Sequence, residues 1–306
     1  MRPIARRLLT AIPTLLVLVT LTFFLMRAAP GGPFDRARVM PPAIEKALAA
    51  QYHLDEPLLK QYGRYLLGLL QGDLGPSFQY EGYEVSELIA GGFPVSALLG
   101  SCALALGVLL GCTLGTIAAL RHRHLTDAGL MTVAMLGMSI PNFVLAPLLI
   151  LVFAVGLGWL PAGGWSWREP ATMVLPVIAL AAPQVAYIAR LMRGSMIEML
   201  ESSFIRTARA KGLPGHRVVL RHALKPAFLP VLSYLGPAAA GIITGSVVIE
   251  QVFGLPGIGR YFVQGAINRD YTLVLGVVLF YGALIVVLNL AVDLMYAAID
   301  PRVRNA

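Results

Sequence analysis

Long apolar stretches alternate with polar segments along the whole chain, and this alternation predicts the architecture. Each stretch has about the 20 residues that a helix needs to cross a bilayer core of about 30 Å. The first runs from Leu8 to Met26 without a charged residue. We therefore predict an all-α membrane protein with six transmembrane helices, at residues 8–26, 93–120, 128–156, 171–189, 227–249 and 272–298.

Three arginines, Arg2, Arg6 and Arg7, precede the first span and leave two interpretations open. A secretory signal peptide also begins with a basic segment, but its apolar region is usually shorter than this one. The residues that follow, Ala28-Ala29-Pro30, make a poor cleavage site. We interpret the segment as an uncleaved transmembrane helix.

The distribution of basic residues predicts the orientation. Of 24 Lys and Arg, 15 lie in the N-terminus, the tail and the two segments on the same side, 121–126 and 190–225. Cytoplasmic segments of membrane proteins carry an excess of Lys and Arg. Both termini are therefore predicted to be cytoplasmic, in a multi-pass membrane protein.

Composition agrees with a membrane bundle. Hydrophobic residues make up 57% of the chain and charged residues 13%, about half the share usual in soluble domains. The net charge of +8 accompanies the spans and does not interleave with aromatic residues, which disfavours nucleic-acid binding.

The spans divide the chain into four predicted segments. Residues 1–28 form the N-terminal transmembrane helix, and 29–92 form an extracytoplasmic region with short helices that begin near Pro42 and after Pro57. Val85 to Ile89 are expected to lie along the membrane interface. Residues 93–298 form a five-helix core that includes a cytoplasmic loop, 196–225, and 299–306 form a cytoplasmic tail.

Polar side chains accompany prolines and glycines inside the middle spans. Each one is explained by hydrogen bonding between helices, but as a set they indicate a polar translocation path. The candidates are Ser139, Asn142, Gln184, Tyr187, Ser233, Tyr234, Thr244, Ser246 and Glu250.

No catalytic residue or metal site is predicted. Glu250 and Asp293 lie near span ends, where water could solvate them or an arginine could pair with them, so a proton relay is disfavoured. The basic segment from Arg121 to His124 would repel a metal cation. No lysine follows a glycine, so a phosphate-binding loop is missing and any ATP energy must come from another chain.

The cytoplasmic loop carries the most specific signal. Six of its residues are Lys or Arg, and Ser202 or Ser203 can cap a short helix that Gly212 ends. Pro214 suits the start of a second helix. Small residues at Ala208 and Ala210 would let a partner approach closely. The loop is therefore predicted to be a docking element, the alternative being a basic loop on anionic lipid.

The loop sequence resembles the coupling loop of peptide-type ATP-binding-cassette importer permeases. In the wider family this loop reads Glu-Ala-Ala, three residues, Gly, nine residues, then Ile-x-Leu-Pro. Ala208, Gly212 and Leu224 match, whereas Arg206, Thr207, His222 and Lys225 depart as in the peptide (oligopeptide, dipeptide and nickel) branch. Further segments look like those of oligopeptide permease B-type subunits, namely 29–34, 72–78, 193–196, 253–259 and 299–301.

This resemblance implies a type I importer permease that moves oligopeptides or dipeptides inward and has no ATPase site of its own. The implied partners are a second homologous permease, two cytoplasmic ATPase subunits that bind ATP and Mg, and a periplasmic or lipid-anchored peptide-binding protein. The coupling residues carried over are Phe204, Ile205, Arg206, Thr207, Ala208, Arg209, Ala210, Lys211, Gly212 and Leu213. A proton-coupled secondary transporter and a membrane-embedded enzyme remain as alternatives.

Overall fold

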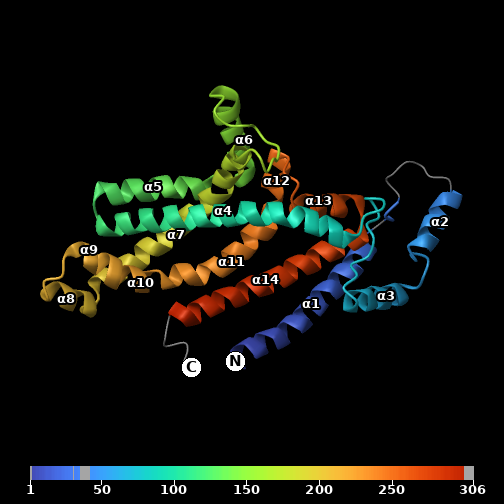
Figure 1. Ribbon diagram of the computed structural model, residues 1–306, viewed down its shortest axis with the longest axis horizontal. Helices are drawn as coiled ribbons and strands as arrows, with labels where there is room; N and C mark the ends of the chain where they lie inside the picture. The colour runs from blue at the N-terminus through green and yellow to red at the C-terminus, as the bar shows by residue number, and fades with distance from the viewer. Residues whose placement is uncertain (1, 30, 35–41, 300–306) are drawn as a thin grey trace. The chain divides into compact units, whose positions relative to one another are not determined.

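Helices form every regular element in the part of the chain that the computed structural model describes, residues 2–29, 31–34 and 42–299 (Figure 1). The N-terminal elements are α1 (Arg2–Ala28), α2 (Pro42–Gln51), α3 (Leu58–Leu70) and α4 (Val85–Leu120). The middle elements are α5 (Leu125–Ser139), α6 (Asn142–Leu149), a π-helical turn (Ile150–Gly156), a 3₁₀ turn (Pro170–Met173) and α7 (Val174–Glu201). The remaining elements are α8 (Ser203–Ala210), α9 (Gly215–Arg217), a π-helical turn (Val218–Ala223), α10 (Leu224–Ala227), α11 (Leu229–Gly245), α12 (Val247–Phe253), α13 (Ile258–Asn268) and α14 (Tyr271–Ile299).

Four of the six predicted spans correspond to single helices, and the other two correspond to bent helix pairs, which gives six spans if each pair crosses once. Within the described residues, four segments are long and apolar enough to cross a membrane singly, namely Leu9–Ala28, Val85–Leu120, Pro170–Glu201 and Tyr271–Val292. The other two spans are Leu125–Ser139 with Asn142–Gly156, bent by 102°, and Gly215–Ala227 with Leu229–Thr244, bent by 48°. The predicted tail beyond Ile299 and the side chain of Asp293 lie outside the described residues.

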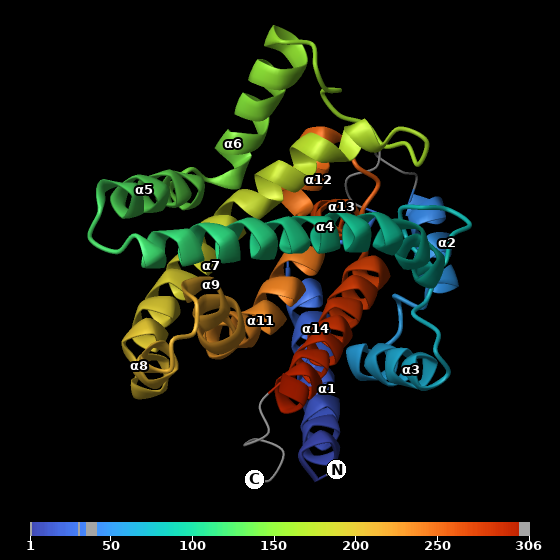
Figure 2. The ribbon, with the colours of Figure 1, turned by 60° about the vertical axis from the view of Figure 1, so that its left-hand side comes forward.

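The predicted third span, residues 128–156, is not one continuous helix, because the chain turns sharply at Pro141. Pro141 has no N–H to continue the hydrogen-bond ladder of α5, and it takes the N-cap position of α6. Figures 1 and 2 both show α6 running across the direction of α5. The polar segment around Pro141 is thus a corner between two helices.

Two other spans begin or end elsewhere than predicted. Val85 to Ile89 are not a separate interfacial segment, since they form the first turns of α4, where Val85 and Leu88 are buried. Helix α7 continues to Glu201, well past the predicted end at Ala189, because Met192 and Met196 extend its buried face. The short helices predicted near Pro42 and after Pro57 are confirmed as α2 and α3.

The chain divides into two compact units, Met1–Val95 with Pro256–Val286, and Ser96–Leu255 with Val287–Ala306. In the first unit, Val85, Ile258 and Leu273 belong to one buried apolar cluster. The buried carboxylate of Asp270 accepts hydrogen bonds from the Ser77 hydroxyl (2.5 Å) and from the backbone N–H groups of Phe78 (3.0 Å) and Leu273 (3.1 Å). Asp270 thereby caps α14 and fixes the polar turn that precedes α4.

In the second unit, glycines let α4 lie directly against α7. A Cβ atom at Gly107, Gly111 or Gly115 would come within 2.4–2.8 Å of α7 atoms, closer than real Cβ atoms approach. Small residues at four-residue spacing are a common means of packing membrane helices, since they bring the backbones together. The contact of these glycines with α7 holds α7 against α4, and most of the candidate site depends on the position of α7.

Candidate functional site

The predicted coupling segment is a short, well-defined helix. Ser202 takes the N-cap position of α8, but its hydroxyl donates back to the Met199 carbonyl (2.6 Å), so the expected side-chain cap is not formed. At the other end Gly212 adopts a left-handed conformation with φ +77°. Its N–H bonds to Arg209 O (2.9 Å) and that of Leu213 bonds to Ala208 O (3.3 Å), the reciprocal pair of a Schellman C-cap. The prediction that Gly212 ends this helix is confirmed.

One face of α8 is buried in its own chain. Ile205 is fully buried, and with Ala208 it joins an apolar cluster that includes Met192 and Met196 of α7 and Val218. Ala208 is therefore small because α8 packs closely here, and not only because a partner must approach. Sequence reasoning did not distinguish these two reasons.

The opposite face of α8 is exposed. Phe204 keeps 46% of its surface accessible. The other exposed members of the predicted coupling set are Arg206, Thr207, Arg209, Ala210, Lys211 and Gly212, and Leu213 is partly buried. The helix thus presents one large aromatic ring among basic and small side chains. Its buried face anchors it to the rest of the chain.

Three of the nine predicted path residues line one cavity of about 310 Å³ in the second unit: Asn142, Gln184 and Tyr234. The Tyr234 hydroxyl donates to Gln184 Oε1 (2.7 Å), and the Tyr187 ring stacks on that of Tyr234 with centroids 4.2 Å apart. The cavity offers neutral hydrogen-bonding groups and the ring of Tyr234, and no charged side chain lines it.

Three other candidates use their hydroxyls locally. Ser139, Ser233 and Thr244 each donate to the backbone carbonyl four residues earlier, of Met135 (2.9 Å), Leu229 (3.2 Å) and Ala240 (2.5 Å). Such bonds satisfy a hydroxyl inside an apolar helix. These side chains are not among those that line the cavity.

The last two candidates, Ser246 and Glu250, form a separate buried group. Glu250 is 1% exposed, and its Oε1 accepts from the hydroxyls of Ser246 (2.5 Å) and Ser96 (2.7 Å). The expectation that water or an arginine would neutralise it is wrong. Two hydroxyls bond to Oε1 in the apolar interior, whereas Oε2 is buried without a hydrogen-bond partner, and Ser96, 154 residues away, had no sequence signal.

An ion-pair network at the start of α5 was also missed. The Arg193 guanidinium donates to both oxygens of the buried Asp127, from Nε at 2.6 Å and Nη2 at 2.7 Å, and His122 Nδ1 lies 3.3 Å from the same carboxylate. The two-pronged pairing fixes α5 to α7. From sequence alone, the segment around His122 counted only toward membrane orientation, whereas His122 itself belongs to this structural network.

A protein metal site of the usual kind would need several His, Cys, Asp or Glu side chains close together. Among the described residues, no group of three or more such side chains could hold a metal ion.

Comparison with known proteins assigns the family. Residues 111–305 match the model of the family described as binding-protein-dependent transport system inner membrane component. The oligopeptide transport system permease protein OppB of Escherichia coli (strain K12) is 56% identical over 301 residues, 98% of each chain. The dipeptide transport system permease protein DppB of Bacillus subtilis (strain 168) is 46% identical over 291 residues, 95% of this chain and 94% of that one.

Solved structures agree in fold. The MetNI methionine ABC transporter in an inward-facing conformation matches with a TM-score of 0.55 at 18% identity, over 70% of this chain and 96% of that one. An amino acid ABC transporter matches with a TM-score of 0.51, over 71% and 94%.

The family model and these relatives identify a permease subunit of a type I ATP-binding-cassette importer, a multi-pass protein of the bacterial inner membrane, and the fold agrees with them. This chain belongs to the family of binding-protein-dependent transport system inner membrane components, in its oligopeptide and dipeptide permease branch. Systems of this class work with ATPase subunits that bind the nucleotide, a second permease and a substrate-binding protein. Both alternatives, the proton-coupled secondary transporter and the membrane-embedded enzyme, are thereby excluded.

Proposed function

We propose that this chain translocates oligopeptides or dipeptides into the cytoplasm. The support is the high identity, over nearly the whole chain, to permeases named for oligopeptide and dipeptide transport. It would pair with a homologous permease and sit on two cytoplasmic ATPase subunits, which hold ATP and Mg. A periplasmic or lipid-anchored binding protein would deliver the peptide.

The exposed face of α8 is the proposed contact with an ATPase subunit. A coupling element must be rigid, since a loose loop would absorb motion without passing it on. Ile205 and Ala208 anchor α8 in the apolar cluster, and Gly212 closes it with two backbone hydrogen bonds. This anchoring, together with the aromatic and basic face opposite, is the observation that carries the proposal.

The cavity of Asn142, Gln184 and Tyr234 is proposed as part of the peptide path. Amide and hydroxyl groups can bond to peptide backbone regardless of sequence, and the stacked rings of Tyr187 and Tyr234 offer an apolar face to varied side chains. Ser246 and Glu250 are proposed as a separate buried part of the path, whereas Ser139, Ser233 and Thr244 would contribute only after rearrangement of their local bonds. Both termini are proposed to be cytoplasmic, which puts α8 on the ATPase side.

The proposal is tested by reversing one charge on the exposed face of α8. The full transporter carrying Arg206→Glu is reconstituted, and peptide uptake and peptide-stimulated ATP hydrolysis are measured. We expect uptake to fall about tenfold or more, as for a central interface residue, with unchanged thermal unfolding of the permease because Arg206 is exposed.

The matched control is Arg121→Glu, an exposed arginine outside the loop 196–225, which should retain uptake. Wild-type uptake in Arg206→Glu would contradict the docking claim. Uptake of a free amino acid or nickel, without uptake of any peptide, would contradict the substrate class instead.

A further inference from the structure

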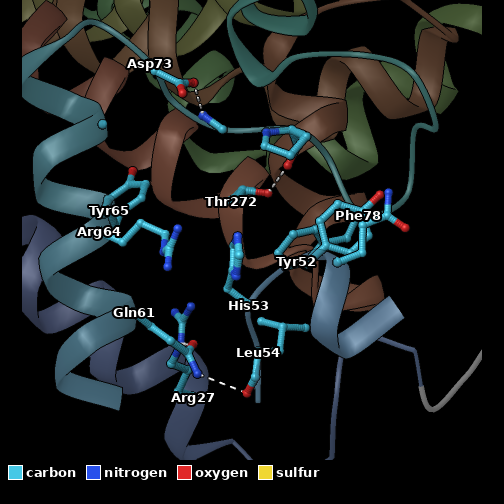
Figure 3. Close-up of a pocket in the computed structure, with 14 residues that line it drawn as sticks. Arg27, Tyr52, His53, Leu54, Gln61, Arg64, Tyr65, Asp73, Phe78 and Thr272 are labelled. Atoms are coloured by element: carbon cyan, nitrogen blue, oxygen red, sulfur yellow. Dashed lines mark hydrogen bonds between the residues drawn. The ribbon is translucent and has the colours of Figure 1, made fainter. Parts of the chain in front are cut away.

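A cavity of about 210 Å³ lies in the first unit, outside every site described above. Its walls come from the C-terminal end of α1, from α3, from the turn that follows α2, from residues 73–78 and from the start of α14 (Figure 3). Arg27, His53, Gln61, Arg64 and Tyr65 line it together. Figure 3 shows Arg64 and His53 on either side of the open space, with Arg27 and Gln61 at one end.

Arg27 is the central observation, because its charge is only partly satisfied. Its Nε donates to Gln61 Oε1 (3.0 Å), and its guanidinium carbon lies 3.7 Å from the centre of the Phe23 ring. Its Nη1 is buried and has no hydrogen-bond partner, and no ion pair in the described part of the chain includes this arginine. A partly buried cation of this kind is costly unless an anion completes it.

The neighbouring groups are also mostly donors. The Tyr65 hydroxyl is buried without a partner, and burial raises the pKa of Tyr65, so the group keeps its proton at neutral pH. Arg64 bonds to Glu56 at 2.8 Å through Nη2 and retains further donors. The carboxylate of Asp73, at the far end of the cavity, already accepts from the Gly75 N–H (2.7 Å). The cavity therefore suits an anion.

The surroundings of α3 indicate where such an anion would come from. This helix packs beside the outer part of the first span, with the hydroxyls of Thr20 and Tyr62 2.6 Å apart. Its opposite face exposes Leu59 (76%) and Leu70 (85%). Leucines exposed beside a span are stable among acyl chains and unfavourable in water. Arg27, in the last turn of that span, is then at the level of the lipid headgroups.

We propose that this cavity binds the phosphodiester of an anionic phospholipid, with Arg27 and Arg64 as its cationic donors. The lipid completes the charge of Arg27 and braces α3 against α1. Its acyl chains lie along the exposed leucines of α3.

The test measures lipid retained by the full chain. Wild type is reconstituted in nanodiscs of phosphatidylcholine with a minor share of phosphatidylglycerol, then extracted gently and weighed by native mass spectrometry. We expect preferential retention of phosphatidylglycerol, and a loss of about tenfold in Arg27→Gln, as for a charge-assisted hydrogen bond. The control is Lys60→Gln, an exposed cation on the same helix that does not line the cavity, with unchanged retention.

Equal retention by wild type and Arg27→Gln would overturn the proposal. If Arg27→Gln fails to fold, Tyr65→Phe and Arg64→Gln decide, since each should still lower retention severalfold while helix content is unchanged. In phosphatidylcholine alone, inorganic phosphate should not raise the thermal stability of wild type. Stabilisation equal to that by phosphatidylglycerol would assign the cavity to a soluble anion, and displacement of the lipid by an added peptide would assign it to a carboxylate.

Discussion

Helices α3 and α8 are both short and amphipathic, and each buries one face against a longer helix. They differ in the face that stays exposed. Helix α3 exposes leucines, among them Leu59 and Leu70, whereas α8 exposes Phe204 among arginines, a lysine and small residues. The buried face shows only that a helix is anchored. The exposed face distinguishes their proposed environments, which are lipid for α3 and a water-soluble protein partner for α8.

The largest change in stability is expected for the buried face that anchors α8. Ile205→Ala removes a fully buried side chain from the cluster around α8, and we expect a loss of about 2–4 kcal/mol in the free energy of unfolding. Arg206→Ala, one residue further on the exposed face, should change it by no more than about 0.5 kcal/mol. Thermal and denaturant unfolding of the purified chain measures both. Similar losses in the two variants would mean that α8 has no anchored face.

A smaller effect distinguishes the two environments directly. Leu59→Asp places a charge where α3 meets acyl chains, and should destabilise the chain in nanodiscs by about 1–2 kcal/mol. Phe204→Asp makes the same kind of change on α8 and should leave stability in nanodiscs nearly unchanged, because that face is in water. Equal sensitivity at the two positions would remove the distinction drawn above.

The smallest effect concerns the end of α8. Gly212→Ala forces a side chain into a left-handed conformation, at a cost of about 1 kcal/mol, although nothing lies within 4 Å of the new Cβ. Gly215→Ala has equal space and no such conformation, so it serves as the matched control. The free energy of unfolding should therefore be lower in Gly212→Ala than in Gly215→Ala. A neutral Gly212→Ala would show that the C-cap does not constrain the helix.

The sequence was most informative where the signal is local. Span number, the short helices α2 and α3, and the end of α8 at Gly212 all follow from periodicity, prolines and glycine conformation. The bend at Pro141 was less predictable, since proline signals a break but not its angle. The boundary at Val85 was missed because a hydropathy pattern cannot separate interfacial residues from buried ones.

The contacts that define the candidate sites depend on distant residues. Glu250 meets Ser96 and Arg193 meets Asp127 across 154 and 66 residues, and neither pairing leaves a local pattern. The glycines of α4 had a readable four-residue spacing, but their partner on α7 did not. Of the polar path residues, only tertiary structure separated Gln184 and Tyr234 from side chains that merely satisfy their own helix.

Helix α7 connects the two candidate sites of the second unit, the cavity and the region of α8. One unbroken helix carries Gln184 at the cavity and Met196 beside α8, and the 12 residues between them span about 18 Å at 1.5 Å per residue. Helix α4 packs along α7 from Gln184 to Arg193, so the two helices would tilt together, and a tilt of about 10° would shift one end of the segment 184–196 relative to the other by about 3 Å. A displacement of that size is comparable to a hydrogen-bond length. Because one continuous helix joins the cavity to the region of α8, a movement at α8 could make or break hydrogen bonds in the cavity without a flexible segment between the two.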